Sequence, residues 1–191
     1  MAPYETAKEI FTRALPAAVL RAQPSSDWLG EFPLPKQVAA YFAELGPVDV
    51  WIQGYGNPYF LPSLSGLWRH QAGYRYHPDT RERFSDWDDD WLVIADEGAD
   101  PFIFSRASAV ILHAYHGQGI WEPVEMFSCL EEMATTFAIM GDIVESAGRA
   151  FTDDASMIFP RYLQDARTRI GRHLHSTERA DAVLQRLGWS A

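Results

Sequence analysis

The chain has 191 residues, of which 47% are hydrophobic and 14% aromatic, and 26 acidic against 16 basic side chains give a formal net charge of −10. A globular chain of this length buries roughly 70% of the surface that its unfolded form exposes, so we expect one folded domain over residues 1–191 without structural metals or disulfides. The acidic balance argues against a nucleic-acid partner, because phosphate binding depends on clustered Lys and Arg. The single cysteine, Cys129, excludes an intramolecular disulfide and favours a reducing compartment.

No membrane-spanning or signal segment is expected. Charged side chains interrupt the N-terminal 22 residues, and the longest apolar run, residues 91–95, is far shorter than the roughly 20 residues of a spanning helix. We therefore expect a cytoplasmic protein that does not bind a membrane.

The N-terminal part of the chain predicts two helices. Thr6 and Glu9 have the spacing of a capping box and precede apolar residues at helical spacing, so a short helix is expected over residues 7–15. A second helix is expected over residues 35–45, because a proline suits a first helical turn and Gly46 suits the position after a last one.

The middle of the chain predicts strands. Residues 48–52 alternate between apolar and polar side chains, which is typical of a half-buried strand. The apolar runs 91–95 and 101–104 flank a short acidic segment and predict a β-hairpin with its loop centred on Gly98. Residues 109–115 predict a further strand, which extends the hairpin to an antiparallel meander.

Helical spacing returns in the C-terminal part. A second capping box opens an expected helix over residues 128–144, and two more helices are expected, one from Pro160 and one over residues 180–187 with Gly188 as its stop. Residues 61–76 carry mixed signals and are assigned a short helix. Because the strands cluster instead of alternating with helices, the sequence predicts an α+β fold with an antiparallel or mixed sheet flanked by helices.

Residues 86–90 (DWDDD) form the most conspicuous acidic cluster. The spacing of these aspartates resembles a calcium-binding loop, but Trp91 stands where the sharp turn of such a loop needs glycine. We interpret the cluster as a solvated turn before a strand, with an acidic patch facing a partner as the alternative.

Asp96, Glu97 and Asp100 surround the expected hairpin turn, where acidic residues and glycine are common for structural reasons. No neighbouring feature of the sequence indicates that one of these carboxyl groups has a raised pKa. A hydrolase with Asp96 or Asp100 as its base is therefore the weaker alternative, and it requires a deep pocket with one strongly perturbed carboxyl group.

No metal site and no cofactor are expected. The six histidines form three pairs along the sequence. The expected strand separates His113 from His116, and the expected helix separates His173 from His175. His70 and His77 lie in or next to the segment with mixed signals. Cys129 has no dedicated histidine base, so no catalytic residue is predicted there.

Aromatic side chains are concentrated between residues 51 and 121, with several arginines among them. Large rings form protein cores, but they also anchor protein interfaces. We therefore favour a protein-binding face in this region over a purely structural role.

Several segments carry a family resemblance: the helix between Leu34-Pro35 and Leu45-Gly46, residues 59–63 (YFLPS), residues 87–104 (WDDDWLVIADEGADPFIF) and residues 127–130 (FSCL). With these segments the chain resembles the SUKH superfamily, the Smi/Knr type of domain, over about residues 34–144. Residues 145–191 would then form a helical C-terminal extension.

The resemblance implies an α+β domain without enzymatic activity. Bacterial members are commonly immunity proteins that neutralise toxins, often nucleases, and fungal members are regulatory scaffolds in cell-wall synthesis and signalling. The leading hypothesis is thus a non-enzymatic immunity protein that binds a basic toxin domain, and a regulatory scaffold without a toxin partner is the alternative. A basic partner also agrees with the negative charge of the chain. The residues predicted to face the partner are Trp68, Trp87, Asp88, Asp89, Asp90, Asp96 and Asp100.

Overall fold

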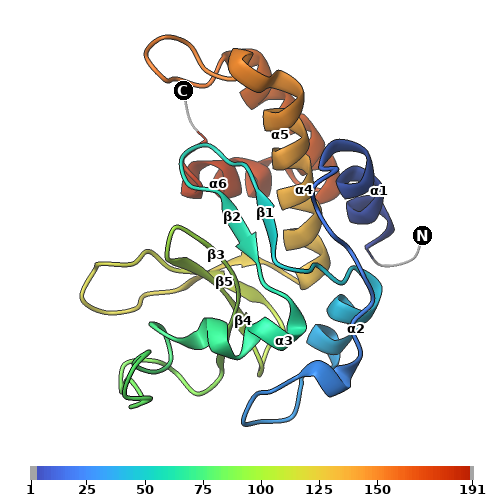
Figure 1. Ribbon diagram of the computed structural model, residues 1–191. Helices are drawn as coiled ribbons and strands as arrows, with labels where there is room; N and C mark the ends of the chain where they lie inside the picture. The colour runs from blue at the N-terminus through green and yellow to red at the C-terminus, as the bar shows by residue number, and fades with distance from the viewer. Residues whose placement is uncertain (1–3, 190–191) are drawn as a thin grey trace. The chain divides into compact units, whose positions relative to one another are not determined.

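The computed structural model describes residues 4–189 and has the expected α+β fold (Figure 1). By their contacts the residues fall into two compact units. The first unit combines Met1–Ala17, Ile52–Pro58 and Glu131–Ala191, and the second combines Ala18–Trp51 and Tyr59–Leu130.

A six-stranded sheet forms the centre of the second unit, apart from Ile52, the last residue of its first strand. The strands follow one another in space as they do in the sequence, which confirms the predicted meander, and the pairs from the second strand onward are antiparallel. The strands are β1 (Val50–Ile52), β2 (Tyr59–Leu61), β3 (Trp91–Glu97), β4 (Asp100–Ser105), β5 (Ile111–His113) and β6 (Val124–Phe127).

The hairpin of β3 and β4 confirms the turn predicted around Gly98. Glu97 pairs with Asp100, so Gly98 and Ala99 form a two-residue turn, and both have positive φ angles, of 57° and 80°. Two-residue hairpin turns need this backbone conformation because it matches the twist of the strands, and glycine adopts it without strain.

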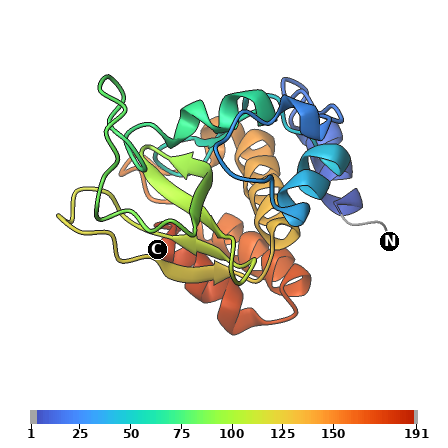
Figure 2. The ribbon, with the colours of Figure 1, turned by 90° about the horizontal axis from the view of Figure 1, so that it is seen from below.

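Shorter helical elements cover the second unit. They are η1 (Ser25–Asp27), α2 (Lys36–Glu44), α3 (Leu64–Leu67) and η2 (Arg69–Gln71). The predicted second helix is confirmed, with Pro35 as its N-cap and Gly46 in the left-handed conformation after its end. After η2 the chain forms a long loop that extends away from the strands before it enters β3 (Figure 2).

The first unit is helical over most of its length. Its helices are α1 (Glu5–Ala14), α4 (Leu130–Ala147, which enters this unit at Glu131), η3 (Gly148–Ala150), α5 (Pro160–His173) and α6 (Thr177–Arg186). Asp142 on α4 is buried and accepts hydrogen bonds from Arg13 on α1 and Arg169 on α5. These charge-assisted bonds tie three helices to one carboxylate.

Within residues 4–189, none of the helices has the length and hydrophobicity that a membrane span needs. Two local expectations are wrong. Helix α1 begins at Glu5 with Tyr4 as its N-cap, so Thr6 lies inside the helix and cannot open a capping box. His175 lies after the end of α5 with a φ angle of 53°, and is not helical.

Two short strands were not expected. The short helix assigned within residues 61–76 is confirmed by α3 and η2, whereas β2, which ends at Leu61, and β6 were not predicted. Strands of three or four residues are too short to show a period, and their pairing with neighbouring strands decides their conformation.

Most of the central aromatic side chains belong to the core of the second unit. Tyr59, Tyr74 and Trp87 are 0%, 8% and 2% exposed, respectively. Trp87 and Tyr74 pack with Val93 of β3 and Ile103 of β4 on one face of the sheet. Most of these aromatic side chains therefore stabilise the core. The exposed rings are the candidates for contacts with a partner.

Candidate functional site

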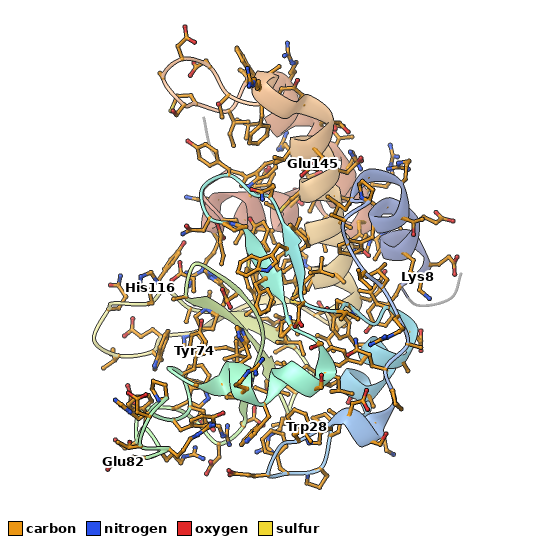
Figure 3. All side chains as sticks on the ribbon, viewed as in Figure 1. Lys8, Trp28, Tyr74, Glu82, His116 and Glu145 are labelled. Atoms are coloured by element: carbon orange, nitrogen blue, oxygen red, sulfur yellow. The ribbon has the colours of Figure 1, made fainter. Side chains whose placement is uncertain are left out.

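An open pocket of about 460 Å³ lies in the second unit, where β2 and β3 meet the segment from α3 to Tyr74. Its lining combines acidic, basic, aromatic and hydroxyl groups. These include Asp49, Phe60, Arg69, His70, Tyr74 and Asp96; Tyr74 is labelled in Figure 3.

Strand register brings Asp96 into this pocket. Asp96 of β3 is opposite Phe60 of β2, so their side chains emerge on the same face of the sheet. Nε2 of His70 lies 2.9 Å from Oδ2 of Asp96, and these side chains are only 17% and 14% exposed. The ring of His70 also contacts the ring of Phe60, at a centroid distance of 5.3 Å.

Asp49 is held at the pocket by the backbone of the neighbouring segment. Its Oδ1 accepts hydrogen bonds from the N–H of Ser63 at 2.9 Å and from its hydroxyl group at 3.0 Å. The φ angle of Asp49 is 49°, a left-handed conformation that aspartate tolerates better than most residues. Oδ2 makes no hydrogen bond within the described part of the chain.

Tyr74 contributes the hydroxyl group of a largely buried side chain. Burial is the main reason why its pKa lies above the ordinary value, and the negative charges of Asp96 and Asp100 raise it further. The phenol therefore stays protonated at neutral pH. Within residues 4–189 its hydroxyl group makes no hydrogen bond, although the side chain is 8% exposed.

The exposed ring beside the pocket is Trp51 of β1, which is 59% exposed. Its indole packs on the ring of Phe60 with a centroid distance of 4.5 Å. The strand alternates as predicted, since Val50 is buried and Trp51 points away from the core. That alternation was the sequence signal for Trp51, although Trp51 was not among the residues predicted to face a partner.

The predicted tryptophans Trp68 and Trp87 have structural surroundings. Trp87 is buried in the core, so its ring is not on the surface of the second unit. Trp68 is half-buried and packs against Phe32 and Tyr76, at centroid distances of 5.5 and 5.9 Å, and against Trp28 (labelled in Figure 3).

The three predicted aspartates before β3 are tied into the turn by the chain itself. Oδ1 of Asp88 accepts the N–H of Asp90 at 2.8 Å, and Oδ2 of Asp90 accepts the hydroxyl group of Ser105 at 2.6 Å. Asp89 pairs with Arg75 and Arg83, although its side chain is 77% exposed. These bonds agree with the interpretation as a turn, and a partner-facing role for the cluster stays a prediction.

The hairpin carboxylates differ from the expectation. Glu97 and Asp100 face each other across β3 and β4, whereas Asp96 emerges on the opposite face because side chains alternate along a strand. Burial, reinforced by the charge of Asp100, raises the pKa of Glu97 to about 8. The expectation that no carboxyl group here is perturbed is therefore wrong. The local sequence could not show this shift, because burial and cross-strand register cause it.

The raised pKa of Glu97 predicts a pH-dependent stability. The unfolded chain releases this proton near the ordinary value of 4.5, whereas the folded chain holds it up to about pH 8. Stability should therefore fall as the pH rises through this range. One pKa unit corresponds to about 1.4 kcal/mol, so the range from about pH 5 to pH 8 sets an upper bound of about 4 kcal/mol. Glu97 is partly exposed, and solvent screening reduces the loss that Glu97→Gln should remove to the order of 2 kcal/mol.

Urea unfolding of the wild type and of Glu97→Gln at several pH values measures this effect. The control is Glu82→Gln, which replaces an exposed glutamate (labelled in Figure 3) and should keep the wild-type pH profile. Parallel profiles for the wild type and Glu97→Gln would show that Glu97 is ionised in the folded protein at neutral pH.

The chemistry open to the pocket follows from its groups. Carboxylates and exposed aromatic rings can hold a cation, and a His–Asp pair can move a proton. None of the described lining residues has a thiol, and no Ser or Thr is among them. Within residues 4–189, no three His, Cys, Asp or Glu side chains are grouped so that they could hold a metal ion.

No family model, curated protein or solved structure matches the chain. The fold and the pocket thus define the class of protein, an α+β protein with an open pocket of mixed charge beside an exposed tryptophan.

Proposed function

We propose that the protein is a non-enzymatic binding module of the kind that its resemblance to the SUKH superfamily implies, an immunity protein that neutralises a basic toxin domain in the cytoplasm. The exposed indole of Trp51 carries this proposal. A tryptophan that leaves more than half of its surface in water is a typical anchor of a protein interface, particularly next to a pocket that can receive a partner side chain.

Electrostatics supports a basic partner. The chain has a net charge of −10, and the pocket beside Trp51 contains the carboxylates of Asp49 and Asp96. A toxin that cleaves nucleic acid needs a basic surface for its substrate, and an acidic inhibitor binds such a surface faster because opposite charges steer the encounter.

The test starts from the genes that flank the gene of this protein, and a toxin encoded directly beside it is co-expressed with this protein. We expect the wild type to restore growth, and Trp51→Ala to weaken the complex at least tenfold in a binding assay, which is the range of an interface hot spot. Leu29→Ala is the matched control, because Leu29 is an exposed apolar side chain of the same unit (67% exposed) away from the pocket.

Two other results would redirect the proposal. Binding of a non-toxic partner through Trp51 would favour the regulatory scaffold. Growth inhibition that persists while the toxin and this protein are both folded and present would contradict the immunity function.

The second candidate is the carboxylate-dependent hydrolase, and the His70–Asp96 pair in the pocket favours it. That hypothesis requires a pocket and a strongly perturbed carboxyl group in one place. The pocket contains Asp96, whereas the raised pKa belongs to Glu97 on the other face of β3. The binding function therefore accounts better for the arrangement.

A further inference from the structure

We infer that the pocket beside Trp51 is a receptor for one arginine side chain, whose guanidinium group pairs with Asp96 and Asp49 and stacks on the aromatic rim. This inference deepens the proposed function, on which it rests for the source of the arginine, a basic partner protein. Three features of the pocket support it, and a fourth lining residue, Arg69, tests the charge of the ligand.

The first feature is a pair of carboxylates from different segments that line one pocket. Asp49 precedes β1 and keeps Oδ2 free of hydrogen bonds within the described residues, because only Oδ1 is used by Ser63. Asp96 uses Oδ2 toward His70. Each carboxylate can therefore offer an oxygen to a donor, and the planar fork of a guanidinium group, with five N–H donors, can contact two acceptors at once.

The second feature is the hydroxyl group of Tyr74. It lines the pocket, belongs to a side chain that is more than nine-tenths buried, and has no hydrogen-bond partner within residues 4–189. The oxygen itself is open to the pocket, so its hydrogen-bonding capacity is available to a ligand there. The phenolic oxygen can accept an N–H of the guanidinium group.

The third feature is the aromatic rim. The rings of Trp51 and Phe60 pack on each other at the edge of the pocket. A guanidinium group stacks on such rings and is more weakly hydrated than an ammonium group, which favours arginine over lysine. The same unit already uses this contact, since the guanidinium group of Arg106 lies 4.0 Å from the ring centroid of Phe32.

Arg69, an exposed cation, also lines the pocket and opposes the binding of a second cation. Its charge repels an incoming guanidinium group, so it should lower the affinity for arginine. Arg69→Gln is therefore expected to strengthen binding, whereas a site for an anion would lose affinity with the same change. The sign of this effect distinguishes the two kinds of ligand.

The experiment titrates the full chain with N-acetyl-arginine amide and follows the indole N–H signals by NMR, with Trp51→Phe to assign the signal of Trp51. We expect the Trp51 signal to shift with a Kd on the order of 1–10 mM. N-acetyl-citrulline amide has nearly the same shape without the charge and should bind at least tenfold more weakly, and N-acetyl-lysine amide should bind severalfold more weakly.

Variants assign the binding to the pocket. Asp96→Asn should weaken binding of the arginine probe at least tenfold, Tyr74→Phe severalfold, and Arg69→Gln should tighten it about twofold to fivefold. Asp79→Asn is the matched control, because it makes the same change in charge at an exposed site of the same unit outside the pocket. Tyr74→Phe keeps the ring, so it tests the hydroxyl group even if Asp96→Asn alters the fold.

Three outcomes would overturn the inference: equal binding of the citrulline probe, equal affinities for Asp96→Asn and Asp79→Asn, or a Trp51 shift caused by inorganic phosphate and lost in Arg69→Gln. Failure of the proposed function gives a different pattern. If the arginine probe binds and the toxin does not, the pocket is an arginine receptor, and the toxin is not its partner. A toxin that binds Asp96→Asn as tightly as the wild type would reject the arginine receptor alone.

Discussion

Replacing Gly46 by alanine is expected to destabilise the second unit by about 4 kcal/mol. Gly46 follows helix α2 with a φ angle of 61°, and a residue with a Cβ atom loses about 1–2 kcal/mol in this left-handed conformation. A Cβ atom here would also lie 2.0 Å from the carbonyl oxygen of Arg21. That contact cannot be relieved by a side-chain rotation, because the segment of Arg21 is bound to the end of α2 through hydrogen bonds of its backbone. Overpacking of this kind typically costs a further 1–3 kcal/mol.

Gly117→Ala is the matched control for this prediction. Gly117 belongs to the same unit and has a φ angle of 76°, but a Cβ atom there would meet no atom within 4 Å. Gly117→Ala should lower the free energy of unfolding only by the conformational contribution, about 1 kcal/mol. Urea unfolding monitored by tryptophan fluorescence reports on this unit, which contains every tryptophan except Trp189. Equal losses for the two variants would show that the segment of Arg21 moves away at no cost.

Replacing Gln71 by leucine is expected to destabilise the same unit by about 3 kcal/mol. Gln71 is completely buried, and its amide group binds the backbone of Val93 on both sides: Nε2 donates to the carbonyl group and Oε1 accepts the N–H, each at 2.9 Å. Strand β2 pairs with β3 only near Asp96 and Glu97. The amide of Gln71 therefore replaces a neighbouring strand at Val93. Leucine would leave these two backbone groups buried without partners, and each such group costs about 1–3 kcal/mol.

The control for Gln71 is Gln37→Leu on helix α2. Gln37 is exposed, so the free energy of unfolding of Gln37→Leu should stay within about 0.5 kcal/mol of the wild-type value. The urea midpoint measured by fluorescence compares the two variants. A loss for Gln71→Leu no larger than that for Gln37→Leu would mean that water, or a shift of β2, satisfies the backbone of Val93.

Local patterns predicted the regular parts of this fold because each depends on near neighbours in the sequence. The alternation around Trp51, the helix ending before Gly46 and the turn at Gly98 are examples, and the structure confirms each of them. The short strand β2 was missed because three residues show no period, and its conformation depends on pairing with β3.

The candidate site was predictable only in part. Asp96 was named from the sequence, but His70 and Tyr74 stand in the segment whose signals were mixed, and Asp49 is far from them along the chain. Antiparallel register and the path of the chain after β2 bring these residues to one pocket. No local pattern contains that information.

The sequence by itself thus determined the α+β class, most of the helices, the central strands and the acidic charge, because composition and periodicity reflect local propensity and burial. Only the tertiary structure decided which aromatic rings are buried and which face water. The composition counts Trp87 and Trp51 equally, but Trp87 is buried and Trp51 is exposed. The tertiary structure also decided which carboxyl group of the hairpin carries a raised pKa, because desolvation and cross-strand charge depend on distances through space. The negative charge that suggests a basic partner is read from the sequence, whereas the pocket that could recognise its arginine exists only in the folded chain.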